Sequence, residues 1–366
     1  MLPEPDDCPA SDLTGETPEL PTDLFDYVLP PASIAQVPAE PRDASRLLVL
    51  DRQRAGVEHA TFREIGRWLR PGDLLVVNRS RVVPARLAAR RRPGGGAAEI
   101  LLLRRIEPGT WEALVRPGRR LTPGARVDLD GGVVGEIVDR TEAGGRVVRF
   151  SAPGCAATDV DDLVLSHGGL PLPPYIHGYA GDPERYQTVY GDRPGSAAAP
   201  TAGLHFTPEL LADLQGQGVG LATVTLHVGL DTFRPVKTDD LLAHQIHRET
   251  CAVPPETAEA IAASRARGGR VIAVGTTTVR TLETAALAAG PSEPIAAWAG
   301  ESSLFIVPGY RFQVVDAMVT NFHLPRSTLL ALVSAFAGRE RIFSAYAEAI
   351  RNDYRFFSFG DAMLLL

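Results

Sequence analysis

The sequence has few cysteines, and none of them is spaced for pairing. Its 366 residues include only Cys8, Cys155 and Cys251, and no two of these form a CxxC pair. We therefore expect neither a disulfide framework nor a four-ligand zinc site, and a reducing compartment fits this usage. The expected location is the cytoplasm.

The chain also lacks a long apolar run, a signal peptide and an excess of positive charge. No stretch of about 18 apolar residues occurs, so we expect no membrane-spanning helix. The N-terminus is acidic and proline-rich, without the basic and apolar regions of a secretory signal. The formal net charge of −7 argues against a broadly basic surface for duplex nucleic acid, although a local basic patch remains compatible with it.

What the chain does contain predicts an α/β protein in two parts. Hydrophobic residues make up 45% of it, enough for a sizeable core. Strands and helices alternate over 23–80 and 156–366, which predicts a larger mixed α/β domain. Residues 81–155 show only short strand-like runs between glycines and prolines, typical of a small inserted antiparallel barrel or sandwich. Residues 1–22 are expected to be a disordered leader.

Caps and periodicity locate individual elements. Helices are expected over 61–70, from Thr207-Pro208-Glu209 onward, and over 255–267, 277–289, 328–337 and 342–352. Strands of the larger domain are expected over 47–50, 74–77, 221–228 and 271–274. In the small domain they are expected over 100–103, 111–115, 126–129, 133–138 and 147–150.

Histidines occupy two segments where a strand or turn meets a glycine or a helix start. His205 directly precedes a helix N-terminus, whose free N–H groups suit an anion. His227 lies at the carboxyl end of a strand, before Gly229, where α/β proteins bind ligands. Each residue could equally be a histidine that only forms hydrogen bonds within the core.

Two further segments carry polar side chains after a strand. Thr276–Thr278 and Arg280 follow a glycine turn, an arrangement suited to a carboxylate or phosphate, although the lysine of a P-loop is missing. Glu283 lies on the same helix face as Arg280, so capping threonines with a surface ion pair are the alternative. The other segment holds Asn321 and His323 ahead of a capped helix.

Two weaker patterns concern metals and nucleic acid. His244, His247 and Glu249 have a spacing that could hold a metal, but no further ligand is identifiable and we expect none. Arginines cluster in the small domain and could contact phosphates, or could form an ordinary solvated face. These arginines are Arg90, Arg91, Arg92, Arg104, Arg105, Arg116, Arg119 and Arg120.

Longer motifs run in order from Leu24 to the last residue. They are Phe25–Pro30, Asn78–Arg86, Leu170–Ile176, Glu184–Tyr190, Leu226–Val228, Gly275–Thr277, Asn321–Pro325 and Tyr354–Met363. In these motifs the chain resembles the S-adenosylmethionine:tRNA ribosyltransferase-isomerase family of queuosine biosynthesis. So many long motifs in one order are highly specific.

The resemblance implies a transferase and isomerase that acts on tRNA. The ribosyl part of S-adenosylmethionine would pass to the aminomethyl group of a deazaguanine base, giving epoxyqueuosine with release of adenine and methionine. S-adenosylmethionine is then a co-substrate, and no metal or other cofactor is expected. The implied fold is a larger α/β domain with an inserted β-barrel, and we expect a monomer.

That chemistry suggests roles for the polar segments. The sulfonium acidifies the adjacent ribose methylene, so a base is needed, and His205, His227 and His323 are the candidates. Arg280 and the Thr276–Thr278 turn would hold the methionine carboxylate, and Arg234 or Asp361 would orient the ribose or the amine. The remaining expected substrate contacts are Arg81, Thr201, Glu283 and Asn321.

Several positions depart from the family pattern and are typical of a divergent member. Arg79 replaces an acid, Asp231 a glycine and Ile246 a methionine, while Glu301–Ser303 replaces a Trp-x-Asp. Two alternatives therefore accompany the main hypothesis. One is ribosyl transfer from S-adenosylmethionine to a different amine, and the other is a non-catalytic tRNA-binding relative.

Overall fold

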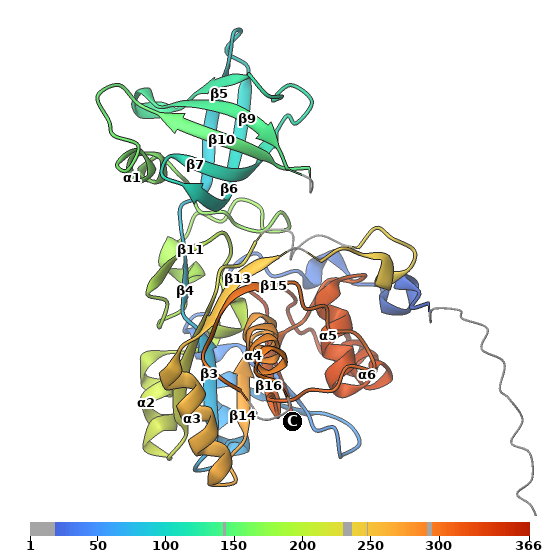
Figure 1. Ribbon diagram of the computed structural model, residues 1–366. Helices are drawn as coiled ribbons and strands as arrows, with labels where there is room; N and C mark the ends of the chain where they lie inside the picture. The colour runs from blue at the N-terminus through green and yellow to red at the C-terminus, as the bar shows by residue number, and fades with distance from the viewer. Residues whose placement is uncertain (1–18, 142–143, 230–235, 247, 291–294) are drawn as a thin grey trace, which may run out of the picture.

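A nine-stranded mixed sheet forms the centre of the larger domain. The computed structural model describes residues 19–141, 144–229, 236–246, 248–290 and 295–366. Within them the strand order is β15-β13-β12-β3-β14-β16-β17-β1-β2 (Figure 1). The strands are β1 (Arg46–Leu50), β2 (Glu58–Thr61), β3 (Leu74–Asn78), β12 (Gly220–Leu226), β13 (Glu249–Val253), β14 (Val271–Val274), β15 (Trp298–Ser302), β16 (Ala317–Asn321) and β17 (Ala362–Leu365).

The middle of this sheet is parallel and buried on both faces. β12, β3, β14 and β16 pair in parallel with their neighbours, while β13, β15, β17 and β2 introduce antiparallel pairs toward the edges. Successive side chains of β3 alternate between two apolar layers, with Leu74 and Val76 in one and Leu75 and Val77 in the other. Burial on both faces explains the continuous apolar runs of these strands.

Helices cover both faces of the sheet. They are α2 (Pro208–Gly216), α3 (Pro255–Ala266), α4 (Thr276–Ala289), α5 (Thr328–Ala337) and α6 (Arg339–Arg351). Apolar side chains of α3 to α6 share one layer, and those of α2 belong to the other. Two of the expected helices begin with a side-chain cap, since the hydroxyl oxygens of Thr207 and Ser327 accept N–H groups of the first turns of α2 and α5.

One helix prediction was wrong in type. The segment expected to be helical over 61–70 forms the 3-10 helix η4 (Phe62–Trp68), although the Glu64 carboxylate does accept the Thr61 N–H. A glycine in its middle and Pro71 just beyond it disfavour a longer α-helix. The other short 3-10 turns are η1 (Thr22–Phe25), η2 (Pro31–Ser33), η3 (Arg42–Ala44), η5 (Asp130–Gly132), η6 (Pro183–Tyr186), η7 (Thr201–His205) and η9 (Leu241–Ala243).

The small domain is a closed antiparallel barrel, which resolves the choice between barrel and sandwich. Its strands are β5 (Arg86–Arg92), β6 (Ala97–Glu107), β7 (Thr110–Arg116), β8 (Arg126–Asp128), β9 (Val134–Arg140) and β10 (Arg146–Ser151). Its own apolar core also includes Val160 and Val164 of helix α1 (Val160–Ser166). Strand β5 was not predicted, because four of its seven residues are arginines and only Leu87 and Ala89 are buried.

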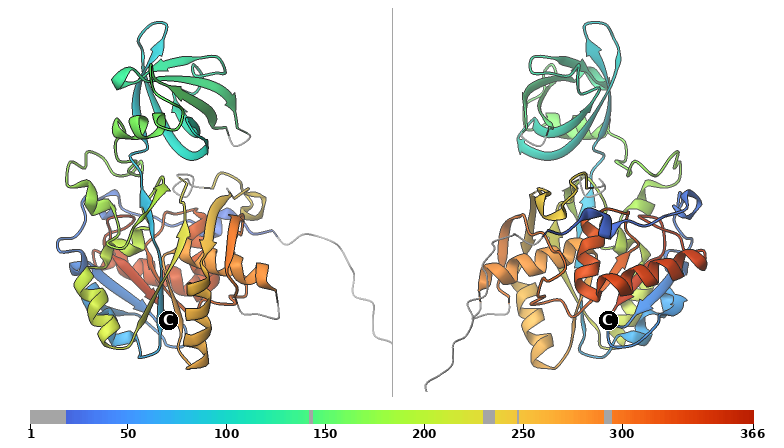
Figure 2. Two further views of the ribbon diagram at one scale, coloured as in Figure 1. Left: turned by 60° about the vertical axis from the view of Figure 1, so that its left-hand side comes forward. Right: turned by 90° about the vertical axis from the view of Figure 1, so that its right-hand side faces the viewer.

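The barrel stands beyond the carboxyl ends of the central strands. The chain leaves β3 and passes through β4 (Ser80–Val82) into the barrel, then returns through β11 (Arg193–Ser196), which pairs with β4 in parallel. Figures 1 and 2 show the barrel at one end of the molecule, joined to the larger domain by these thin connections. No helix in the described part of the chain is long and apolar enough to cross a membrane.

Candidate active site

Several of the expected site residues gather where the central parallel strands end. His227 follows β12, Thr276 and Thr277 follow β14, and Asn321 ends β16 with His323 two residues later. Because parallel strands end at one edge of the sheet, tertiary structure brings these distant segments together. This edge is the one that faces the barrel.

Two cavities open at this edge. The larger one, about 520 Å³, lies between the two domains, with Arg104, Arg105, Trp111, Glu112 and Asp161 on the barrel side and His227, Gly229, His244, Glu249, Arg280 and Phe305 on the other. The smaller one, about 50 Å³, is lined by Thr201, Thr276, Thr277, Asn321 and His323 among others. Leu329 lines both, so the two cavities are neighbours.

His205 is buried and held by protein groups on both ring nitrogens. Nδ1 lies 2.7 Å from the Ser45 hydroxyl, and Nε2 lies 3.3 Å from the amide nitrogen of Asn321. Asn321 is in turn fixed by the Thr201 hydroxyl, which donates to its side-chain oxygen at 2.8 Å. Burial, with a smaller contribution from Arg355 and Arg42, lowers the pKa of His205 to about 3, so the ring is neutral near pH 7.

His323 is buried in the same way. Its Nε2 lies 3.1 Å from the Thr320 hydroxyl and its Nδ1 lies 3.4 Å from the Tyr346 hydroxyl. Burial lowers its pKa to about 3. His205 and His323 are therefore neutral, and their ring nitrogens already have partners within the protein.

His227 differs from the other two because it faces the larger cavity. Its side chain is half-buried, and its Nδ1 has no hydrogen-bonding partner among the described residues. Burial lowers the pKa of His227 below its ordinary value, so it too is neutral near pH 7. A neutral imidazole with an unpartnered nitrogen at a cavity wall can accept a proton from a ligand.

The His227 ring packs against a residue that must be glycine. Gly195 of β11 has φ +133°, and a Cβ there would lie 2.9 Å from His227 Cε1 and 3.1 Å from Nδ1. We expect Gly195→Ala to displace the imidazole and reduce kcat about 10-fold or more, since small misplacements of a reacting group are costly. Steady-state turnover would measure it, and unchanged kcat in a folded variant would contradict this role of Gly195.

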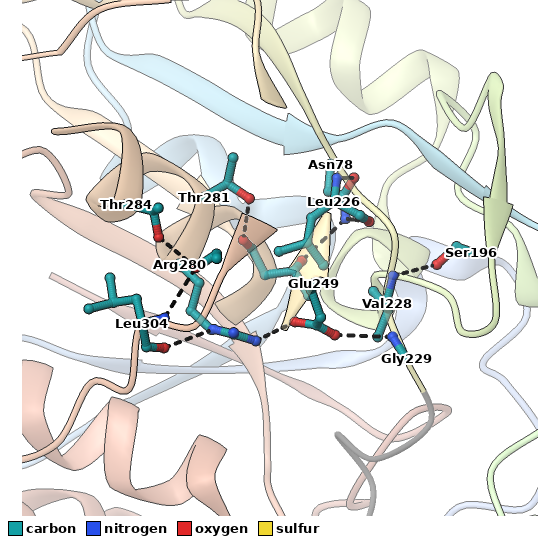
Figure 3. A network of polar contacts seen from close by, with 12 residues as sticks. Asn78, Ser196, Leu226, Val228, Gly229, Glu249, Arg280, Thr281, Thr284 and Leu304 are labelled. Atoms are coloured by element: carbon teal, nitrogen blue, oxygen red, sulfur yellow. Dashed lines mark hydrogen bonds and ion pairs between the residues drawn. The ribbon is translucent and has the colours of Figure 1, made fainter. Parts of the chain in front are cut away.

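Arg280 and Glu249 form a buried ion pair at the wall of the larger cavity (Figure 3). Arg280 Nη1 donates to Glu249 Oε2, and Arg280 Nε donates to the Leu304 carbonyl at 3.2 Å. The other Glu249 oxygen accepts the Gly229 N–H at 3.0 Å. The predicted alternative of a surface ion pair between Arg280 and Glu283 is wrong, because both residues are buried and Arg280 pairs with Glu249 instead.

Several expected contacts lie away from both cavities. The Glu283 carboxylate accepts N–H groups of Gln313, Val314 and Val315 and the Tyr310 hydroxyl, so it fixes a loop. Buried Asp361 accepts the N–H groups of Arg46 and Arg355. Arg81 forms an ion pair with Glu184, and Thr278 donates to the Val274 carbonyl. Arg234 and Asp231 lie outside the described residues.

Other parts of the expected site are only partly described. His247 lies outside the described residues, and those described hold no group of three or more potential metal ligands. Of the barrel arginines, Arg92 pairs with Asp128, Arg104 with Glu112, and Arg105 with Asp161. Four are exposed and form no ion pair with any described residue: Arg90, Arg116, Arg119 and Arg120.

Sequence reasoning missed three residues at the larger cavity. Glu249 was considered only as a metal ligand, and neither Gly195 nor Trp111 was singled out. Trp111 is buried, and its indole N–H donates to Asp161 of α1 at 2.7 Å. Only tertiary structure gathers these residues around the cavity that His227 lines, because Trp111 comes from the barrel, Gly195 from β11 and Glu249 from β13. The glycine in the short strand β11 was a possible signal for close approach.

The fold and this site define an α/β enzyme with an inserted barrel and a histidine- and arginine-lined cavity between its domains. Residues 22–365 match the family described as "Queuosine biosynthesis protein". The chain belongs to that family.

Individual relatives agree over nearly the whole chain. The S-adenosylmethionine:tRNA ribosyltransferase-isomerase of Heliobacterium modesticaldum is 56% identical over 346 residues, covering 94% of this chain and 99% of the relative. That of Thermotoga maritima is 52% identical, covering 93% and 98%. A crystal structure of S-adenosylmethionine tRNA ribosyltransferase from Thermotoga maritima matches with TM-score 0.54 and 45% identity, covering 94% and 100%.

Proposed function

We propose that the chain is an S-adenosylmethionine:tRNA ribosyltransferase-isomerase. It transfers and isomerises the ribosyl part of S-adenosylmethionine onto the aminomethyl-deazaguanine base of tRNA, forming epoxyqueuosine and releasing adenine and methionine. The names of relatives more than half identical over nearly their full length support this reaction over the two alternatives. The proposed enzyme is a cytoplasmic monomer that uses no metal or other cofactor.

The observation that carries the proposal is His227 at the wall of the cavity between the domains. The reaction needs a group that removes a proton from the ribose methylene beside the sulfonium. Of the three candidate histidines, His227 lines the larger cavity and has a nitrogen without a described partner. His205 and His323 are fully bonded, and we assign them to holding Asn321 and the sheet edge rather than to proton transfer.

Charged and polar groups around the cavities suit the other parts of the substrates. Arg280 in the larger cavity is proposed to hold the methionine carboxylate. Thr276 and Thr277 line only the smaller cavity, so they are proposed, with Thr201 and Asn321, to contact the substrate from there. The four exposed barrel arginines that form no ion pair with a described residue are proposed to contact tRNA phosphates.

The test is adenine release from S-adenosylmethionine with purified protein, with and without tRNA carrying the aminomethyl-deazaguanine. Release that depends on this tRNA, with epoxyqueuosine formed, is the expected result, and prior EDTA treatment should not change it. Release with a small amine in place of the tRNA would favour the different-acceptor alternative. Binding of the tRNA without adenine release would favour a non-catalytic relative.

A further inference from the structure

Glu249 is hydrogen-bonded to two different segments at the wall of the larger cavity. Its Oε1 accepts the N–H of Gly229, two residues after His227 on the same segment. Its Oε2 bonds to Arg280 of α4, and only 6% of the Glu249 side chain is exposed. One carboxylate therefore joins the strand end that carries the proposed base to the guanidinium on the neighbouring helix (Figure 3).

The bonds around Arg280 leave one edge of its guanidinium without an acceptor in the described part of the chain. Glu249 takes Nη1 and the Leu304 carbonyl takes Nε. Nη2 is buried and has no hydrogen-bonding partner among the described residues, although Arg280 lines the cavity. A buried donor left unpaired is unfavourable, which points to an acceptor supplied by a ligand. The planar guanidinium suits a carboxylate oxygen in that place.

We infer that Glu249 is a positioning residue, which fixes Arg280 so that its Nη2 edge recognises the α-carboxylate of the amino-acid part of the co-substrate. This inference rests on the proposed function and adds to it the group that orients Arg280. The charges of Arg280 and Glu249 offset each other, so the ligand carboxylate is selected by a directed N–H group of Arg280. A carboxylate so held lies at a fixed position relative to the strand end of His227.

The inference is tested by comparing the binding of S-adenosylmethionine with that of its decarboxylated analogue. Both are titrated by calorimetry in the presence of tRNA that lacks the reactive amine, so that no turnover occurs. Wild-type protein should prefer S-adenosylmethionine by about 10- to 100-fold, the range of one charge-assisted hydrogen bond. Glu249→Gln should remove most of this preference by weakening only the carboxylate-bearing ligand.

Glu64→Gln is the matched control, because the Glu64 carboxylate also joins a backbone N–H, that of Thr61, to an arginine, Arg67. It lies on η4, outside both cavities, and should keep the wild-type preference. If Glu249→Gln fails to fold, the double variant Glu249→Gln/Arg280→Gln replaces the ion pair with a neutral amide pair. It should fold and bind both ligands equally.

A merely structural Glu249 gives a different pattern. Glu249→Gln would then weaken both ligands by the same factor, and the preference for S-adenosylmethionine would survive. In the double variant, which lacks Arg280, a surviving preference would show that Arg280 does not recognise the carboxylate. Either result overturns the inference. So does wild-type protein that binds both ligands equally, even when adenine release proceeds as proposed. A preserved preference without any adenine release would instead overturn the proposed function and leave the carboxylate site standing.

Discussion

Replacing His227 by glutamine should lower kcat for tRNA-dependent adenine release by about 10²- to 10⁴-fold, the usual contribution of a general base. The glutamine side chain has a similar size and can fill the space beside Gly195, but it cannot accept a proton near pH 7. Affinity for S-adenosylmethionine should change little, because Arg280 and Glu249 remain in place. Single-turnover kinetics with calorimetry would separate the two effects.

His177→Gln is the control for this substitution. His177 is exposed and lines neither of the two cavities at the sheet edge, so its replacement should leave kcat unchanged. A His227→Gln variant that turns over at the wild-type rate would show that another group acts as the base. A protonated His227 cannot act as a base, so kcat/KM of the wild-type protein should fall as the pH decreases. Because burial lowers the pKa of His227, this fall should begin at a lower pH than the ordinary pKa of a histidine would give.

Acid should destabilise the fold through His205 and His323 well before most carboxylates titrate. Each has a folded pKa of about 3 against an ordinary value of 6.5. Between these values the unfolded chain binds a proton that the folded chain does not, so the free energy of unfolding falls as the pH falls. Each histidine contributes about 1.4 kcal/mol per pH unit, or together about 5 kcal/mol between pH 6.5 and 4.5.

Urea unfolding at several pH values would measure this effect. His205→Gln removes one of the two groups while its amide can still reach Ser45 and Asn321, so its pH slope should be smaller by about 1.4 kcal/mol per pH unit. His167→Gln is the control, since that histidine is exposed, and its slope should match that of wild-type protein. Parallel curves for wild-type protein and His205→Gln would show that His205 titrates alike in both states.

The elements that could be predicted are those whose sequence pattern depends only on neighbouring residues. The apolar runs of β1, β3 and β14 and the caps Thr207 and Ser327 are local, and the structure confirms them. The edge strand β15 and its neighbour β13 have mixed burial and were not predicted, because their pairing partners decide their conformation. Strand β5 was obscured because four of its seven residues are arginines, which leave few apolar positions for a strand pattern.

The candidate site shows the same division. Sequence motifs selected His205, His227 and His323 with equal weight, because each follows a strand or turn in the same way. Only the structure separates them, since hydrogen-bond partners and access to a cavity depend on segments far away in the chain. The same holds for Arg280, whose sequence neighbour Glu283 was the obvious partner and whose actual partner is Glu249.

The sequence by itself determined the family, the α/β class, the inserted small domain and the set of polar residues at the strand ends. These follow from local hydrophobic patterns, caps and ordered motifs, which need no knowledge of distant contacts. Tertiary structure alone decided which of the three candidate histidines lines the larger cavity, which carboxylate holds Arg280 and where the barrel meets the sheet. Burial, pairing of charges and cavity shape arise only when segments separated by many residues pack together.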